Sequence, residues 1–195
     1  MTAVFPSAYF PSIGYLKAYF SHKDRCIEVY ESFPKQTYRN RCDIATSMGK
    51  LRLSIPLKKP EGSKTKTKDV LLDGSATWQK EHWRSIRTAY ASAPYFEQYD
   101  KEVYQLIHTD SKYLMDLNSD ILEFIHEVVD LPFEKQETDS YNADGIIDLR
   151  NETFDSVETP AYFQVFSEEN GFIPHLSILD LLFNEGPFIR NWILS

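Results

Sequence analysis

The stretch Tyr9-Phe10-Pro11-Ser12-Ile13-Gly14-Tyr15 decides how this chain begins to fold. An apolar run at Ala3–Phe5 precedes it, a helical pattern over residues 13–22 follows, and a second strand-like run, Cys26–Tyr30, comes next. A strand, a turn rich in aromatic residues with Pro and Gly, a helix and a second strand are the order in which a βαβ unit opens. The stretch therefore predicts an α/β protein with an N-terminal βαβ-like unit.

A β-hairpin is predicted around Met48-Gly49, because glycine adopts turn conformations that a β-carbon disfavours. Pairing outward from this turn places Ile44 opposite Leu53 and Cys42 opposite Ile55. Strand alternation then gives one mostly apolar face, which also includes Asn40. The opposite face carries four charged residues: Arg39, Arg41, Asp43 and Arg52.

A helical middle section follows, because apolar residues repeat there at helical spacing. The predicted helices run from Trp78 to about Ala91, from Pro94 onward, and from Ser111 to about Asp130. Short strands are predicted over residues 133–137 and 162–166.

A short helix near the end of the chain has recognisable boundaries. Ser177 and Asp180 are typical of a capping box at its start, and Gly186 with Pro187 predicts its end. Together these patterns predict one α/β domain over residues 1–195, with a mixed sheet, a hairpin and a helical middle section.

The bulk composition excludes several classes of protein. The net charge of −8 argues against nucleic-acid binding, because that affinity comes largely from cations that neutralise phosphates. The lysine-rich run over residues 58–69 is interpreted as a mobile solvated loop. No run approaches about 18 apolar residues, so no membrane span is expected. Two cysteines and the absence of a signal-peptide pattern predict a cytoplasmic protein.

Cys42 and His82 are the candidates for acid–base or nucleophilic chemistry. A thiolate needs a nearby imidazole or positive charge, but the hairpin pairing points Cys42 into the apolar face, which favours a structural role. His82 shares a helical stripe with Trp78 and Ile86. It is either a core residue bonded to backbone or a general base in a dry pocket beside tryptophans.

Positively charged residues give the best anion-binding candidates. Arg39, Arg41 and Arg52 could hold a phosphate or carboxylate in forked geometry, or could pair with Asp43 at the surface. His175 precedes a predicted helix N-terminus, which favours anions, although a turn histidine is the favoured interpretation. The histidine and acid spacings match neither zinc nor calcium motifs, so neither a metal nor a cofactor is expected.

Five segments in their order and spacing resemble the WbqC-like protein family, in the form found in Bacteroidetes-type bacteria. They span residues 9–187 and read YFPSIGYLKAYF, KQTYRNRCDI, GKLRLSIPL, WQKEHWRSIRTAYASAPYFEQY and FQVFSEENGFIPHLSILDLLFNEGP. Two departures stand out. Ser7-Ala8 stands where distant members have Gln-Pro, and Cys42 stands where many have an apolar residue, which further disfavours it as a nucleophile.

The resemblance implies a biosynthetic role. Members are associated with gene clusters for bacterial surface polysaccharide of the O-antigen type and with other biosynthetic clusters, and that context suggests acyl or aminoacyl transfer to an amino sugar. The alternative is a non-catalytic binding or scaffold protein of the same pathway. The expected partner is a small-molecule substrate, either a sugar nucleotide or a group presented on an acyl carrier.

The family motifs map onto named residues of this chain. The Pro-X-X-Gly-Tyr turn is Pro11, Gly14 and Tyr15, the Arg-Asn-Arg motif is Arg39, Asn40 and Arg41, and Tyr95 lies in the Ala-Pro-Tyr-Phe corner. We expect Arg39 and Arg41 to hold an anionic group such as a diphosphate or phosphopantetheine. His82 would take the proton from an attacking amine, and Tyr9, Tyr15 and Tyr95 would line the cleft.

Overall fold

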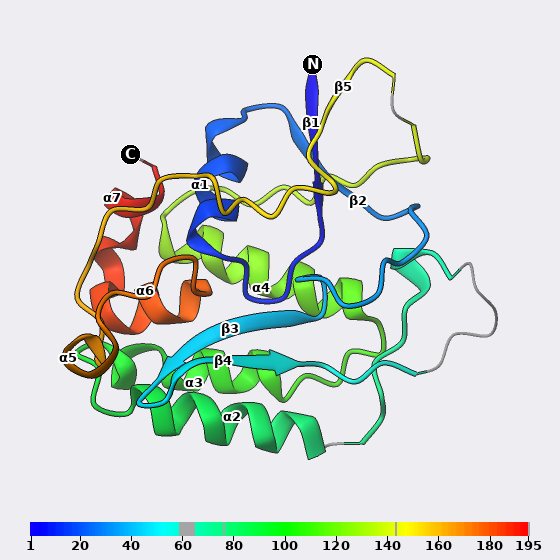
Figure 1. Cartoon of the computed structure of the whole chain (residues 1–195). Helices are drawn as coiled ribbons and strands as arrows, with labels where there is room; N and C mark the ends of the chain where they lie inside the picture. The colour runs from blue at the N-terminus through cyan, green and yellow to red at the C-terminus, as the bar shows by residue number, and fades with distance from the viewer. Residues whose placement is uncertain (59–64, 76, 143, 195) are drawn as a thin grey trace.

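The computed structural model describes residues 1–58, 65–75, 77–142 and 144–194 (Figure 1). The strands are β1 (Thr2–Pro6), β2 (Arg25–Glu28), β3 (Arg41–Thr46), β4 (Gly49–Ser54) and β5 (Ile146–Asp148). The α-helices are α1 (Ile13–Ser21), α2 (Thr77–Tyr90), α3 (Phe96–Ile107), α4 (Leu114–Val128), α5 (Ser167–Asn170), α6 (Ile178–Glu185) and α7 (Ile189–Ile193). Two 3₁₀ turns, η1 (Thr67–Asp69) and η2 (Gly186–Phe188), complete the elements.

The N-terminal βαβ unit is confirmed. β1 is the central strand of a parallel sheet in the order β2-β1-β5, with Val4 opposite both Cys26 and Asp148. α1 connects β1 to β2, and it begins at Ile13 because the Ser12 side chain caps it, accepting a hydrogen bond from the Tyr15 amide at 3.2 Å. Phe5 packs edge-on against Tyr15, which fixes α1 to the sheet.

The hairpin is confirmed, but its predicted register is wrong by two residues. Thr46 pairs with Gly49, so the turn is Ser47-Met48, and Cys42 lies opposite Leu53. The positive φ of Gly49, +96°, follows the turn residues instead of lying between them, and the Thr46 hydroxyl donates to the Gly49 carbonyl at 2.8 Å. A shift of two residues keeps every side chain on its face, so Cys42 stays buried.

The two short strands predicted late in the chain do not form. Residues 133–137 are extended, with only an isolated bridge from Glu137 to Ile27. Residues 162–166 contain no strand, because the side chain of Gln164 satisfies the backbone of Ile173 in place of a neighbouring strand. The third strand of the sheet is β5, which the sequence pattern does not reveal.

The helical predictions hold with small changes at the ends. α2 begins at Thr77, α3 at Phe96 and α4 at Leu114. Gly186, at φ +55°, ends α6 as predicted. The capping box is wrong: Ser177 is the N-cap without a side-chain bond, and the Asp180 carboxylate instead accepts bonds from Tyr90 and Tyr162.

The lysine-rich run is only partly described, since residues 59–64 of the predicted loop lie outside the described residues. Within the remainder, Thr67–Asp69 form η1, which corrects the loop prediction there, while Lys58, Lys66 and Asp69 are exposed as expected. Thr67 of η1 is fully buried, and its hydroxyl lies 3.3 Å from the carboxylate of Glu31.

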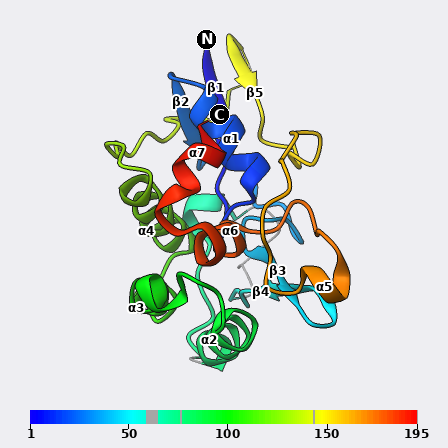
Figure 2. The same cartoon turned by 90° about the vertical axis from the view of Figure 1, so that its left-hand side faces the viewer.

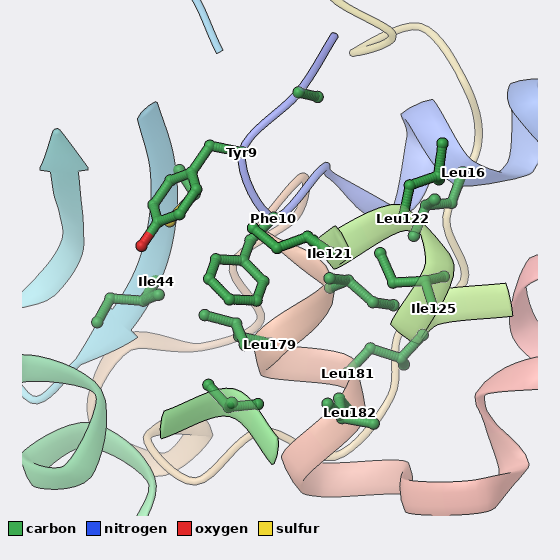
Figure 3. Close-up of a cluster of buried hydrophobic side chains, with 14 of the residues drawn as sticks. Tyr9, Phe10, Leu16, Ile44, Ile121, Leu122, Ile125, Leu179, Leu181 and Leu182 are labelled. Atoms are coloured by element: carbon green, nitrogen blue, oxygen red, sulfur yellow. The ribbon is translucent and has the colours of Figure 1, made fainter. Parts of the chain in front are cut away.

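The elements are arranged with the parallel sheet at one end, the hairpin in the middle and the α2–α3 pair at the other end (Figures 1 and 2). The core lies where α1, α4, α6 and β3 converge. Figure 3 shows Tyr9 directed toward β3 at Ile44, while Phe10 is directed toward Leu179 of α6. Both aromatic residues are almost completely buried, so the opening aromatic stretch forms the centre of the fold.

Candidate functional site

A half-open cleft lies just beyond the carboxyl end of β1, between the start of α1, the first half of α4 and the extended segment 133–137. Its empty space measures about 440 Å³ with the open mouth included. The enclosed part is narrow and admits only a few water molecules. The carboxyl ends of parallel strands are where α/β sheets usually bind ligands, which makes this cleft the candidate site.

The walls are apolar and the rim is charged. Tyr15, Tyr19, Met115 and Leu122 supply buried apolar surface. The Tyr15 hydroxyl donates to the Pro6 carbonyl at 2.7 Å, which fixes its ring against the cleft, and burial raises its pKa well above the ordinary value. Segment 133–137 forms the charged rim, where Lys135 and Glu137 pair at 2.9 Å and Glu134 has no ion-pair partner among the described residues.

Ser7 and Asn118 are the buried polar residues of the cleft. The Asn118 side-chain amide donates to the Ser7 hydroxyl oxygen at 2.6 Å and to the Arg39 carbonyl at 2.9 Å. Because a carbonyl only accepts, the second bond fixes which end of the amide is nitrogen. The Asn118 Oδ1 atom is then buried without a partner in the described part of the chain.

This pair leaves one acceptor and one donor for a ligand. The Asn118 Oδ1 atom is a free acceptor, and the Ser7 hydroxyl, whose oxygen accepts from Asn118, keeps its hydrogen for donation. A buried acceptor without a partner costs about 1–3 kcal/mol, which a bound N–H or O–H group would recover. The geometry therefore suits a group that both donates and accepts, such as a sugar hydroxyl or amine.

The Pro-X-X-Gly-Tyr motif is placed at this cleft. Pro11 and Tyr15 line it. Gly14 does not, but it allows close packing: a β-carbon there would lie 2.5 Å from the Phe154 carbonyl oxygen. The motif therefore holds the 154 loop against α1 as well as shaping the cleft wall.

Arg39 does not offer its guanidinium to a ligand, contrary to the sequence expectation. It donates to both oxygens of Glu31, at 2.6 and 2.9 Å, and to the Arg150 carbonyl at 3.0 Å, and only 4% of the residue is exposed. The reason is the buried carboxylate of Glu31, which uses the forked donor set that a phosphate would need. Arg39 does not line the cleft, and its link to the site is its carbonyl, which accepts from Asn118.

The other two arginines differ from each other. Arg52 pairs with Asp43 at 2.7 and 2.9 Å, which is the alternative that the sequence left open. Burial alone would raise the pKa of Asp43, but the bonds from Arg52 and Tyr38 outweigh it and lower the pKa. Arg41 has no ion pair among the described residues, and its buried Nε atom has no partner.

Asn40 lies between the two motif arginines and serves the hairpin. Its side-chain amide donates to the Ile55 carbonyl at 2.8 Å, and its Oδ1 atom is buried without a partner among the described residues. Of the three motif residues, Arg41 alone keeps a free cationic group.

His82 lies in the core beside Tyr9, outside the cleft. The Tyr9 hydroxyl lies 3.0 Å from its Nδ1 atom, and its Nε2 atom lies 3.3 Å from the Ser54 carbonyl. Because that carbonyl only accepts, Nε2 carries the hydrogen and Nδ1 accepts from Tyr9. Burial lowers the pKa of His82 to about 4, so the ring is neutral at pH 7.

Tyr95 and His175 lie at opposite ends of α6. Tyr95 packs against Gly186 at the C-terminal end, and a β-carbon on Gly186 would meet its ring at 2.4 Å. His175 precedes the N-terminal end with a positive φ of 59°, and its buried Nδ1 atom has no partner in the described chain. Of the three tyrosines predicted to line one cleft, Tyr15 does so, whereas Tyr9 and Tyr95 lie outside its lining.

Cys42 is 1% exposed, and burial raises its pKa well above the ordinary value. A buried thiol with a raised pKa is a poor nucleophile. The structure thus gives the disfavoured cysteine route no support.

A buried ionic network lies next to the cleft. Arg150 donates to Glu28 at 2.9 Å and to Asp148 at 2.7 Å, and Glu28 is fully buried. Glu28 also accepts bonds from the amides of Tyr30 and Glu31. Because Arg39 bonds to both Glu31 and the Arg150 carbonyl, the network is continuous, and its polar groups are satisfied within the protein.

Ser7 and Asn118 were not among the predicted site residues. Two signals were present: Ser7 directly follows the first strand, and Asn118 interrupts the apolar stripe of the helix that carries Leu114, Leu117 and Ile121. A polar residue on a buried helical stripe needs a polar partner, and that partner is Ser7 together with the Arg39 backbone.

Comparison with known proteins gives one family match. A model of the WbqC-like protein family matches residues 7–151. The chain is also 29% identical over 96 residues to the uncharacterized protein Rv1507c of Mycobacterium tuberculosis, an alignment that covers 49% of this chain and 41% of that protein. The chain therefore spans less than half the length of this relative. No solved structure matches the chain.

Two structural features are absent from the described residues. Among them, no helix is long and apolar enough to cross a membrane. The same residues contain no group of three or more His, Cys, Asp or Glu side chains placed to hold a metal ion.

Proposed function

The chain belongs to the WbqC-like protein family, and on that premise we propose that it is a biosynthetic enzyme of bacterial surface polysaccharide, of the O-antigen type or a related pathway. The reaction we propose is transfer of an acyl or aminoacyl group to an amino sugar. The gene-cluster association implied by the family resemblance supports the pathway. The hydrogen-bonding groups of the cleft support an amino sugar as the acceptor of the transferred group.

The observation that carries the proposal is the unpartnered Asn118 Oδ1 atom beside the Ser7 hydroxyl. A sugar hydroxyl or amine presents a donor and an acceptor on one atom and so complements both groups. The rings of Tyr15 and Tyr19 supply the apolar wall that the carbon face of a sugar needs. The amine would lie toward the carboxylate-bearing rim.

The proposed step forms one bond and breaks another. The amine nitrogen attacks the acyl carbonyl carbon, a C–N bond forms, and the bond from that carbon to the carrier oxygen or sulfur breaks. The nitrogen loses a proton, for which Glu134 is the cleft carboxylate without an ion-pair partner among the described residues. His82, the base expected from the sequence, is the alternative acceptor, but it lies outside the cleft, so the amine would have to reach it in the core beside Tyr9. Arg41 and His175 remain the proposed anion-binding residues.

Ligand binding tests the cleft directly. UDP-glucosamine is titrated against the full chain by calorimetry, with UDP-glucose as the matched ligand that lacks the amine. Ser119→Phe fills the cleft from α4, whereas Glu127→Phe places the same ring on an exposed part of α4 that does not line it. We expect about tenfold weaker binding in Ser119→Phe alone, and about tenfold preference for the amine.

Transfer is tested by mass spectrometry. The chain is incubated with UDP-glucosamine and the glycyl thioester of N-acetylcysteamine, and the product should gain the mass of one glycyl group. Unchanged binding in Ser119→Phe would contradict the cleft assignment, and equal binding of both sugar nucleotides would contradict the proposed contact of the amine with the carboxylate-bearing rim.

The second candidate is a non-catalytic binding protein of the same pathway, and the narrowness of the enclosed cleft favours it. It predicts ligand binding that depends on Ser119 without any transfer product. Binding without a mass gain, for both glycyl and acetyl thioesters, would select this candidate.

A further inference from the structure

A second surface feature lies far from the cleft, on the pair of helices at the opposite end of the molecule from the sheet. Figure 2 shows α2 and α3 side by side there. An open groove runs between them, with Lys80, Arg84 and Arg87 of α2 on one side and Tyr104 and His108 of α3 on the other. Trp83 lies between the two sides.

The charge of this groove is opposite to that of the protein. The chain carries a net charge of −8, yet the described residues that line the groove include three cations and no carboxylate. The three cationic residues are exposed, and none forms an ion pair within the described part of the chain. The acids of the two helices, Glu81, Glu97, Asp100 and Glu102, lie outside the lining. The cations are thus available to an external anionic partner.

The spacing of the cations indicates the shape of that partner. Lys80, Arg84 and Arg87 follow one face of α2 and span about 10 Å along its axis, at 1.5 Å per residue. A single phosphate or carboxylate is much shorter than this row. Acidic side chains on successive turns of a helix repeat at the same rise and would meet the three cations in order.

The aromatic residues supply the apolar part of the contact. Tyr104 is 43% exposed, and its ring meets Trp83 edge-on at 5.2 Å. His108 covers one face of Tyr104 at 3.9 Å, and Phe96 stacks on Trp83, so one face of each ring is already in use. The ring surface that remains exposed is apolar and can pack against aliphatic side chains. Trp, Tyr and Arg are also the residue types that dominate protein interfaces.

We propose that the α2–α3 groove docks an acidic amphipathic helix of a protein partner. The partner carries carboxylates at positions i, i+4 and i+7, which meet Lys80, Arg84 and Arg87, and aliphatic side chains that pack on Trp83 and Tyr104. An amphipathic helix that lies in a groove of its partner is a recurring mode of peptide recognition. The proposal does not depend on the function proposed for the cleft.

A helical peptide tests the groove without knowledge of the natural partner. The probe is a fluorescein-labelled, alanine-based peptide of about 20 residues with Glu at i, i+4 and i+7 and Leu on the adjacent positions. The matched probe has Gln in place of each Glu. Fluorescence anisotropy with the full chain should show at least about tenfold tighter binding of the Glu peptide in low salt, and the difference should shrink in about 0.3 M salt.

Variants locate the binding. The double variant Arg84→Glu with Arg87→Glu should bind the Glu peptide about tenfold or more weakly, and Tyr104→Ala should bind both peptides more weakly. Lys101→Glu, an exposed charge reversal on α3 outside the groove, is the matched control and should leave binding unchanged. Ser119→Phe, which fills the cleft, should also leave it unchanged, so failure of either proposal is recognised separately.

Three outcomes would overturn the proposal. The first is equal binding of the Glu and Gln peptides, or no binding of the Glu peptide in low salt. The second is stronger binding of pyrophosphate or polyuridylate than of the Glu peptide, which would make the groove a polyanion site. The third is a change in sedimentation mass caused by the arginine reversals, which would assign the groove to a second copy of the chain.

Discussion

The cleft beside β1 and the ionic network behind β2 contain similar polar groups but differ in whether those groups are satisfied. In the network, Arg39 and Arg150 have their buried guanidinium groups bonded to carboxylates of the same chain. In the cleft, the Asn118 Oδ1 atom has no partner among the described residues. One residue belongs to both regions, since the Arg39 guanidinium joins the network while its carbonyl holds Asn118.

This difference separates groups that maintain the fold from groups that can bind. An arginine whose donors already meet a buried carboxylate has nothing left for a substrate, whatever its motif suggests. A buried acceptor left without a partner is costly, and its persistence points to a ligand or water. The two regions therefore predict opposite responses to mutation: large losses of stability in the network, and losses of binding in the cleft.

The largest effect is expected where the network loses its buried carboxylate. Glu28→Ala leaves Arg150, whose side chain is 1% exposed, without that partner, and removes an acceptor for two backbone amides. Breaking a buried pair in this way costs about 3–5 kcal/mol in the free energy of unfolding. Urea unfolding measures it. Asp148→Asn removes the charge of the half-exposed partner of the same arginine but keeps one acceptor oxygen, and should cost only about 1 kcal/mol. Equal losses in both variants would show that burial does not distinguish them.

His82 and Tyr9 are also hydrogen-bonded within the protein, and the pH dependence of stability tests this contact. Burial lowers the pKa of His82 in the folded state from 6.5 to about 4. Between pH 6.5 and pH 4, His82 therefore binds a proton in the unfolded chain but stays neutral in the folded one. Stability is therefore full above pH 6.5 and falls as pH drops toward 4, by about 2 kcal/mol at pH 5.

His82→Gln isolates this contribution, because glutamine can donate to the Ser54 carbonyl and accept from Tyr9 without titrating. Urea unfolding at pH 7.5 and pH 5 gives the free energy of unfolding of both proteins. The advantage of the wild type over the variant should be about 2 kcal/mol smaller at pH 5 than at pH 7.5. The pKa of His126 is also lowered by burial, but its effect is common to both proteins and cancels. A difference independent of pH would contradict the buried, neutral ring.

A smaller effect on stability is expected at the start of α1, where Gly14 packs against the 154 loop. Gly14→Ala places a β-carbon 2.5 Å from the Phe154 carbonyl oxygen, so the backbone of the 154 loop or of α1 must shift. Such overpacking costs about 1–3 kcal/mol. Gly74→Ala is the matched control, because nothing lies within 4 Å of its added β-carbon. Thermal unfolding should separate the two variants, and equal melting temperatures would show that the 154 loop is not held against α1.

Much of the fold follows from the sequence, because local signals set it. The βαβ opening, the three helices of the middle section and the end of α6 each depend on residues close together in the chain. The hairpin register was missed by two residues because the Thr46 side chain, not the position of the glycine, holds the turn. β5 was missed because its pairing with β1 joins residues more than a hundred positions apart.

The site follows less well from the sequence, for a physical reason. The motif residues Pro11 and Tyr15 both line the cleft, because the turn that carries them is local, and their part in substrate binding stays a prediction. Whether an arginine is free depends on distant partners: Arg39 and Arg41 stand two positions apart, and Glu31 holds only the first. No periodicity reveals that pairing, nor the contact between Asn118 and Ser7 across the fold.

The smallest change in stability is expected at Ser7, and it tests the cleft most directly. Ser7→Ala removes the hydroxyl, but the Asn118 amide keeps its bond to the Arg39 carbonyl, so unfolding should lose only about 0.5–1.5 kcal/mol. Binding of UDP-glucosamine should nevertheless weaken about tenfold, because the ligand loses its donor. Ser75→Ala, at an exposed serine, should change neither quantity. If Ser7→Ala lost stability but kept its affinity for UDP-glucosamine, Ser7 would stabilise the fold, as the residues of the network do. The contrast between the two regions would then be removed.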